Sequence, residues 1–90
     1  MKSKETITIE DCSNFYSVEV AFIRELDNHG LIELTHSNES YTIGHDQLSL
    51  LEKYMHLHYD LDVNLEGIEV ISHLLQKIDR LQTEVRRFKN

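Results

Sequence analysis

Two histidines and two aspartates near the middle of the chain carry side chains that could bind a divalent metal ion. They are His56, His58, Asp60 and Asp62, and imidazole and carboxylate groups are common ligands of such ions. Residues two positions apart on a helix point in different directions, so His56 and His58 cannot chelate one ion together unless the helix ends between them. Solvated polar side chains are therefore the favoured interpretation, and we expect no metal site.

The single thiol of the chain, at Cys12, is the next candidate for chemistry. Glu10 and Asp11 lie beside it, and their negative charge would raise the thiol pKa, so we expect a half-buried structural cysteine rather than a nucleophile. The sequence contains no glycine-rich phosphate loop, no zinc-protease pattern and no serine in a nucleophile elbow. We expect neither an enzyme nor a bound cofactor.

Negative charge is the most distinctive property of the composition. The chain has 9 Lys and Arg against 16 Asp and Glu, a net charge of -7. Residues 1–76 hold four basic and fourteen acidic residues, or -10, whereas residues 77–90 hold five basic and two acidic residues, or +3. This balance argues against nucleic acid or an anionic membrane as the partner. Two interpretations remain: a surface that only keeps the protein soluble, or an acidic docking face for a basic partner.

The first half of the chain has the pattern of a winged helix-turn-helix. Alternating residues predict a short strand at 6–9, after which Thr8 and Asp11 have capping-box spacing for a brief helix that ends near Ser13 and Asn14. A second helix is predicted from about residue 19 to 28, and Gly30 suits the left-handed position that closes it. Its inward face would hold Phe22, Ile23 and Leu26. Strands at 31–35 and 41–43, joined by a polar turn at 36–40, complete the wing.

The second half is predicted to be helical. A connecting helix opens at residues 44–46 and runs to about Tyr59, and Asn64 is a natural N-cap for the last helix. That helix carries an apolar row with heptad spacing, formed by Ile71, Leu74, Ile78, Leu81, Val85 and Phe88. We expect its first half to pack on the body and its last two turns to project. The row is either an ordinary core-facing stripe of a monomer or the seam of a homodimer formed by Ile78, Leu81, Val85 and Phe88.

The length of 90 residues fits one domain. Within it we expect the winged helix-turn-helix at 6–44, the connecting helix at 45–63 and the amphipathic helix at 64–90. The start, Met1-Lys2-Ser3-Lys4, is not followed by an apolar signal core, and no stretch is long and apolar enough to span a membrane. We expect a cytoplasmic protein.

DNA binding, the usual activity of helix-turn-helix proteins, is disfavoured by charge. The predicted second helix carries Glu19, Glu25 and Asp27 beside a single Arg24. The tip of the wing carries Glu39 and no basic residue. Recognition of DNA needs several Lys or Arg side chains to neutralise phosphates, and carboxylates at the same positions oppose docking.

Parts of both halves of the chain resemble known families. Residues 7–12 (ITIEDC), 18–26 and 30–33 (GLIE) resemble the opening of MerR-like helix-turn-helix domains. Residues 57–71 (LHYDLDVNLEGIEVI), continuing to Leu81, resemble the CbpM family of chaperone modulators. This resemblance implies a mainly α, MerR-like protein with a small β-hairpin and a long C-terminal helix. It also implies a dimer that binds the J-domain of a DnaJ/CbpA-type co-chaperone and restrains the action of that co-chaperone on DnaK.

The candidate partner-binding residues come from charge, because J-domains dock onto Hsp70 through a basic helix. The first set is Asp60, Asp62, Glu66 and Glu69, and the second is Glu19, Glu25 and Asp27. Two other functions stay open: a MerR-type DNA-binding transcriptional regulator, and a structural adaptor that joins other proteins through the last helix.

Overall fold

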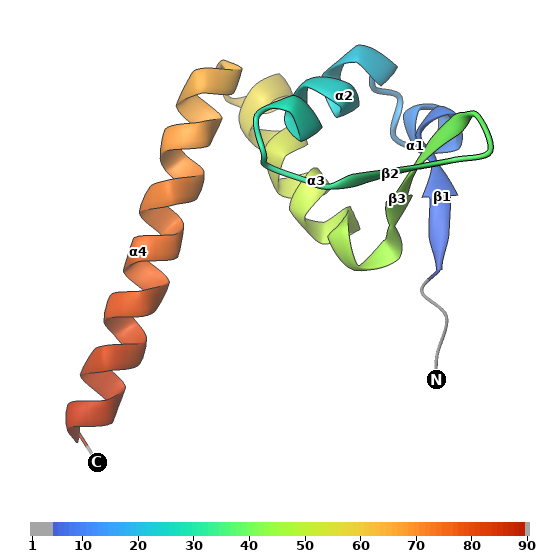
Figure 1. Ribbon diagram of the computed structural model, residues 1–90. Helices are drawn as coiled ribbons and strands as arrows, with labels where there is room; N and C mark the ends of the chain where they lie inside the picture. Colours follow the sequence, from blue (N-terminus) through green and yellow to red (C-terminus); the bar gives the residue numbers. More distant parts are fainter. Residues whose placement is uncertain (1–4, 90) are drawn as a thin grey trace.

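The computed structural model describes residues 5–89 and is mainly helical, with a small antiparallel sheet (Figure 1). Residues 1–4 and 90 of the expected domain lie outside the described residues. In chain order the elements are β1 (Thr6–Thr8), α1 (Ile9–Tyr16), α2 (Val20–Asn28), β2 (Leu34–Ser37), β3 (Ser40–Gly44), the 3₁₀ turn η1 (His45–Gln47), α3 (Leu48–Met55), the π-helical turn η2 (His56–Asp60) and α4 (Leu65–Lys89). The predicted fold class, a MerR-like winged helix-turn-helix with a long last helix, is confirmed.

Helix α1 is longer than predicted. Its start is as expected, because the Thr8 hydroxyl accepts a hydrogen bond from the Asp11 N–H at 3.1 Å. It does not end at Ser13 and Asn14 but continues to Tyr16, and Ser17, in the left-handed conformation at φ 59°, closes it. The Ser13 hydroxyl bonds to the Val18 carbonyl instead of breaking the helix, so the polar side chain stabilises the corner between α1 and α2.

The wing is a tighter hairpin than predicted. Strand β3 pairs with both β1 and β2, so the strand order is β1-β3-β2. The connecting turn is only Asn38 and Glu39, both at positive φ (50° and 66°), rather than residues 36–40. Strand β2 accordingly begins at Leu34, three residues later than expected. Two residues at positive φ match the right-handed twist of paired strands, which favours so short a turn.

The core lies between α1, α2, the sheet and α3. Helix α2 buries the predicted face, Phe22, Ile23 and Leu26, and Gly30 follows it at φ 73° as predicted. The other fully buried side chains of the core are those of Ile9, Cys12, Ile43, Leu51 and Ile68. Cys12 is therefore buried completely, not by half as expected, and burial raises the pKa of its thiol.

The predicted connecting helix is divided into three parts, η1, α3 and η2. In η2 the Leu61 N–H donates to the His56 carbonyl five residues earlier at 3.2 Å. This wider turn brings the His58 ring onto Phe22 and lets its Nδ1 bond to the Val63 carbonyl at 2.9 Å. The chain then turns sharply at Asp62, at φ 59°, before α4 begins.

Helix α4 begins as predicted and leaves the body earlier than predicted. Asn64 caps it, since its Oδ1 accepts from the Gly67 N–H at 2.8 Å. Ile68 is the buried residue of α4, and Leu65 packs against the core beside it. The expected packing of the first half therefore holds for its first two turns, to residue 72, whereas residues 73–89 are all exposed, so a longer part of the helix than the expected last two turns is exposed. Burial of a side chain such as Ile68 contributes about 1.5–3 kcal/mol. The helix starts at a corner of a small body and points outward, so little protein lies beside its later turns (Figure 1).

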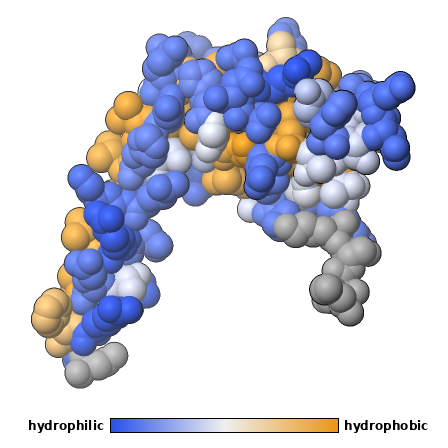
Figure 2. Space-filling view, viewed as in Figure 1, coloured by the Kyte–Doolittle hydropathy of each residue, from blue (hydrophilic) through white to orange (hydrophobic). Residues whose placement is uncertain are grey.

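The projecting arm is amphipathic. The space-filling view shows apolar side chains along one edge of α4 and polar ones over much of the rest (Figure 2). Within residues 5–89, no helix is long and apolar enough to cross a membrane.

Candidate functional site

The acidic candidates lie around the junction of α2, η2 and the start of α4. Aromatic contacts hold this junction together: the Phe22 ring of α2 lies 4.8 Å from that of His58 and 5.2 Å from that of Tyr59, centroid to centroid. The two sets of acids, which are about 30 residues or more apart in sequence, are therefore carried on neighbouring elements.

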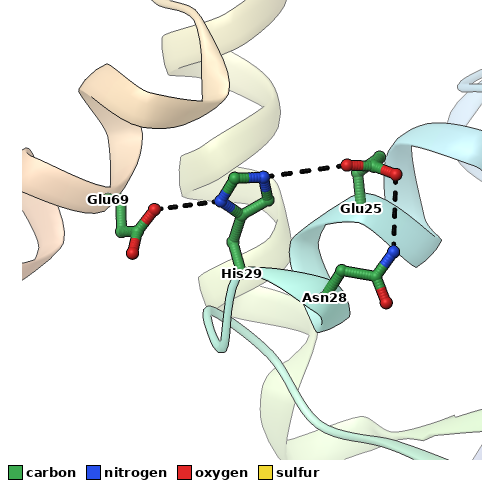
Figure 3. A network of polar contacts seen from close by, with 4 residues as sticks. All are labelled: Glu25, Asn28, His29 and Glu69. Atoms are coloured by element: carbon green, nitrogen blue, oxygen red, sulfur yellow. Dashed lines mark hydrogen bonds and ion pairs between the residues drawn. The ribbon is translucent and has the colours of Figure 1, made fainter.

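One histidine joins the two sets directly. His29, which follows α2, places Nδ1 2.9 Å from Glu69 Oε1 of α4 and Nε2 3.7 Å from Glu25 Oε1 of α2 (Figure 3). Asn28 Nδ2 donates to the second oxygen of Glu25 at 3.4 Å. The sequence analysis did not select His29. Its position at a helix C-terminus, where a cation is favoured, was the one available signal.

This histidine changes the electrostatics of the site. The hydrogen bond to Glu69 raises the pKa of His29, and the charges of Glu69, Glu25 and Glu66 act in the same direction, while partial burial opposes them. His29 therefore carries more positive charge near neutral pH than an ordinary histidine. It offsets part of the negative charge at this corner and ties α4 to α2.

Two other candidate carboxylates already have partners within the chain. Asp60 Oδ2 lies 2.8 Å from His56 Nδ1, one turn away and on the surface. Asp27 is partly buried, and its Oδ1 accepts from the Leu34 N–H at 3.3 Å. Asp27 therefore stabilises the loop into β2, which makes it a weaker candidate for contacting a partner than its charge suggested.

The remaining candidates are displayed at the surface. Glu19, Asp62 and Glu66 are all exposed. Glu19 is the residue before α2 and makes no side-chain capping bond. Asp62 sits in the sharp turn that leads to α4.

His56 and His58, the two histidines weighed as metal ligands, form hydrogen bonds with different partners. His56 is exposed and bonds to Asp60, whereas His58 bonds to the Val63 carbonyl. In the part of the chain that the structure describes, no three His, Cys, Asp or Glu side chains are grouped so that they could hold one metal ion.

A pocket of about 390 Å³ opens beside this junction, between the end of α1 and the side of α3 and η2. Its lining includes Tyr16, Glu52, Met55, Tyr59 and Asp60. The Tyr16 hydroxyl donates to Glu52 Oε2 at 2.6 Å. Burial, reinforced by this hydrogen bond, raises the pKa of Tyr16 to about 12, so the hydroxyl stays protonated and keeps donating. Sequence reasoning missed this pocket because its two walls are 36 residues apart.

The predicted dimer-seam residues are free of the body. Ile78, Leu81 and Val85 are each about half exposed (49%, 49% and 53%), and Phe88 is 90% exposed. Leu74 and Leu75, at 52% and 43%, extend the same exposed surface toward the body. Such a continuous exposed apolar stripe is typical of an interaction surface.

A comparison with models of protein families identifies the family of this chain. Residues 7–90 match the family described as MerR HTH family regulatory protein. The chain belongs to the MerR family. A search of curated proteins finds no match. Membership in this family of regulatory proteins suggests that the chain is a non-enzymatic regulator. In this MerR-family protein, Glu25 of α2 and Glu19 just before it are exposed. The guanidinium of Arg24 lies over the Tyr41 ring of the wing, 4.8 Å from its centroid.

Proposed function

We propose that this MerR-family protein is a cytoplasmic chaperone modulator. In this proposal it binds the J-domain of a DnaJ/CbpA-type co-chaperone through its acidic junction and restrains the action of that co-chaperone on DnaK. The observation that carries the proposal is the position of residues 57–71, the segment that resembles the CbpM family. These residues form most of η2, the turn after it and the start of α4, and they carry Asp60, Asp62, Glu66 and Glu69.

The charge of this junction supports a basic protein partner. Between Arg24 and Lys77 the chain has one basic residue, Lys53. A basic helix approaching α2, η2 and α4 would therefore meet more negative than positive charge, even though His29 offsets part of the charge of Glu25 and Glu69. Complementary charges raise association rates and favour the correct partner. A competitor that covers the basic helix of a J-domain would block the docking of that helix onto DnaK.

Calorimetry of the full chain with the purified cognate J-domain tests the proposal. We expect a micromolar or tighter complex that weakens with added salt, because screening acts over about 8 Å at physiological ionic strength. Neutralising the first set together (Asp60→Asn, Asp62→Asn, Glu66→Gln and Glu69→Gln) is expected to weaken binding strongly.

A matched control removes the same four charges elsewhere on the exposed surface, by Glu10→Gln, Glu33→Gln, Glu39→Gln and Glu84→Gln. The control variant should bind nearly as well as the parent. No binding by the parent at low salt would end the proposal. Equal losses in both variants would show that net charge, and not this junction, attracts the J-domain.

We propose further that two copies pair through α4. The apolar row of one helix would cover that of the other, which removes Ile78, Leu81, Val85 and Phe88 from water. Charge favours an antiparallel pair, because Arg86, Arg87 and Lys89 would then approach the acidic start of the partner helix. A parallel pair would instead place these cations beside their copies.

DNA binding is the second candidate, because it is the usual activity of helix-turn-helix proteins. Three exposed carboxylates oppose it: Glu19 just before α2, Glu25 on α2 and Glu39 at the wing tip. We expect no retention of a fluorescently labelled duplex at physiological salt. Retention there would make transcriptional regulation the better proposal.

A further inference from the structure

The pocket between α1, α3 and η2 combines aromatic walls with two carboxylates. Tyr16 at the end of α1 and Tyr59 in η2 supply the rings, and Glu52 and Asp60 supply the charges. At about 390 Å³ it lies at the small end of the range of ligand pockets, about 300–1,000 Å³.

We infer that this pocket binds the guanidinium group of an arginine presented by a protein partner. The inference rests on the proposed function for the partner, a basic helix, and adds the place where one of its side chains is anchored. Arginine is favoured over lysine because its planar group stacks on aromatic rings and donates two parallel hydrogen bonds to a carboxylate.

The hydrogen bonds within the pocket prepare it for a cation. Tyr16 donates to one oxygen of Glu52, at 2.6 Å, and His56 bonds to one oxygen of Asp60, at 2.8 Å. Each carboxylate is thereby held in place while its other oxygen can accept from a guanidinium. A preorganised carboxylate loses less side-chain freedom on binding than a mobile one.

The surroundings of the pocket are those of a protein interface. Tyr59 is 48% exposed, and Phe15, 76% exposed, makes a T-shaped contact with Tyr16 with ring centroids 4.9 Å apart. Leu61, 56% exposed, follows Asp60 in the chain. Exposed aromatic and aliphatic side chains around a charged pocket are typical of the centre of an interface, where Arg and Tyr are enriched.

The first experiment needs no J-domain. The ¹⁵N-labelled full chain is titrated with Nα-acetylarginine amide and, separately, with the uncharged analogue Nα-acetylcitrulline amide, while amide chemical shifts are followed by NMR. We expect arginine to shift the amides of residues 16–18, 52 and 55–60, citrulline to leave them in place, and Glu52→Gln/Asp60→Asn to abolish the response. No shifts, shifts spread over all acidic residues, or equal shifts with Nα-acetyllysine amide would overturn the inference.

The second experiment uses the J-domain and separates the two proposals. Glu52→Gln/Asp60→Asn should weaken binding about tenfold or more, whereas the matched control Glu10→Gln/Glu39→Gln should change it by less than about threefold. Equal weakening in both would overturn the pocket as the anchor while leaving J-domain binding intact. If arginine binds in the pocket but the parent does not bind the J-domain, the inference of an arginine site is upheld and the chaperone proposal fails.

Discussion

Substitution of Gly67 by alanine tests how tightly the start of α4 is fitted. Gly67 lies in the first turn of α4, and helix propensity alone predicts that alanine stabilises it by about 0.8–1.0 kcal/mol. The structure predicts the opposite. A Cβ at this position would lie 2.8 Å from Val63 Cγ1 and 3.1 Å from the Asn64 Oδ1 that caps the helix.

The two costs can be estimated. Valine is stiff at χ1, and Val63 packs against the core, so overpacking should cost about 1–3 kcal/mol. Displacing the Asn64 side chain weakens a cap worth about 0.5–2 kcal/mol. After the propensity gain is subtracted, Gly67→Ala should destabilise the protein by about 0.5–4 kcal/mol and lower Tm by at least about 2 °C.

Thermal unfolding followed by circular dichroism, at one fixed protein concentration, measures this change. Val63→Ala removes the methyl group in contact, so Gly67→Ala should cost less in the Val63→Ala background than in the parent. A Tm for Gly67→Ala equal to or above that of the parent would refute the close fit, and with it our account of why glycine stands in this segment.

Three further changes address α4 and its attachment. Leu81→Glu places a charge in the exposed row and should convert a dimer to a monomer in sedimentation, whereas an equal mass for parent and variant would argue against pairing. Ile68→Ala leaves a cavity where α4 enters the core and should cost about 2–5 kcal/mol in denaturant unfolding; a loss below 1 kcal/mol would contradict its role as the anchor. His29→Gln removes a group whose pKa is raised above 6.5, mainly by Glu69, so the stability difference between parent and variant should be largest below pH 6.5 and fall as the pH rises through the raised pKa. A difference that does not change with pH would contradict the ionic contact with Glu69.

Local pattern was enough to predict the order of the elements. The inward face of α2, the glycine after it and the Asn64 cap depend on spacing within one turn, so they could be read from the sequence. The limits of elements were predicted less well, since they depend on contacts made elsewhere. Ser13 and Asn14 favour a break by themselves, but the bond from Ser13 to Val18 allows α1 to continue to Tyr16.

The candidate acidic residues could likewise be predicted from the sequence only in part. Their charge is a property of composition, and it alone selected them. Which of them are available to a partner depends on neighbours from other elements: Asp27 is engaged by the Leu34 N–H, and Glu69 and Glu25 share His29. No spacing rule connects residue 29 with residue 69, because the contact exists only once η2 has turned the chain back toward α2.

The sequence by itself determined the net charge, the heptad row of α4 and the types of its elements, because these follow from residue identity and from periods of two to seven residues. Only the tertiary structure decided that α4 is exposed from residue 73 onward and that the Tyr16 hydroxyl bonds to Glu52 at one side of a pocket. Such contacts depend on where distant elements come to lie when the core is filled, and the packing of the whole chain fixes that position.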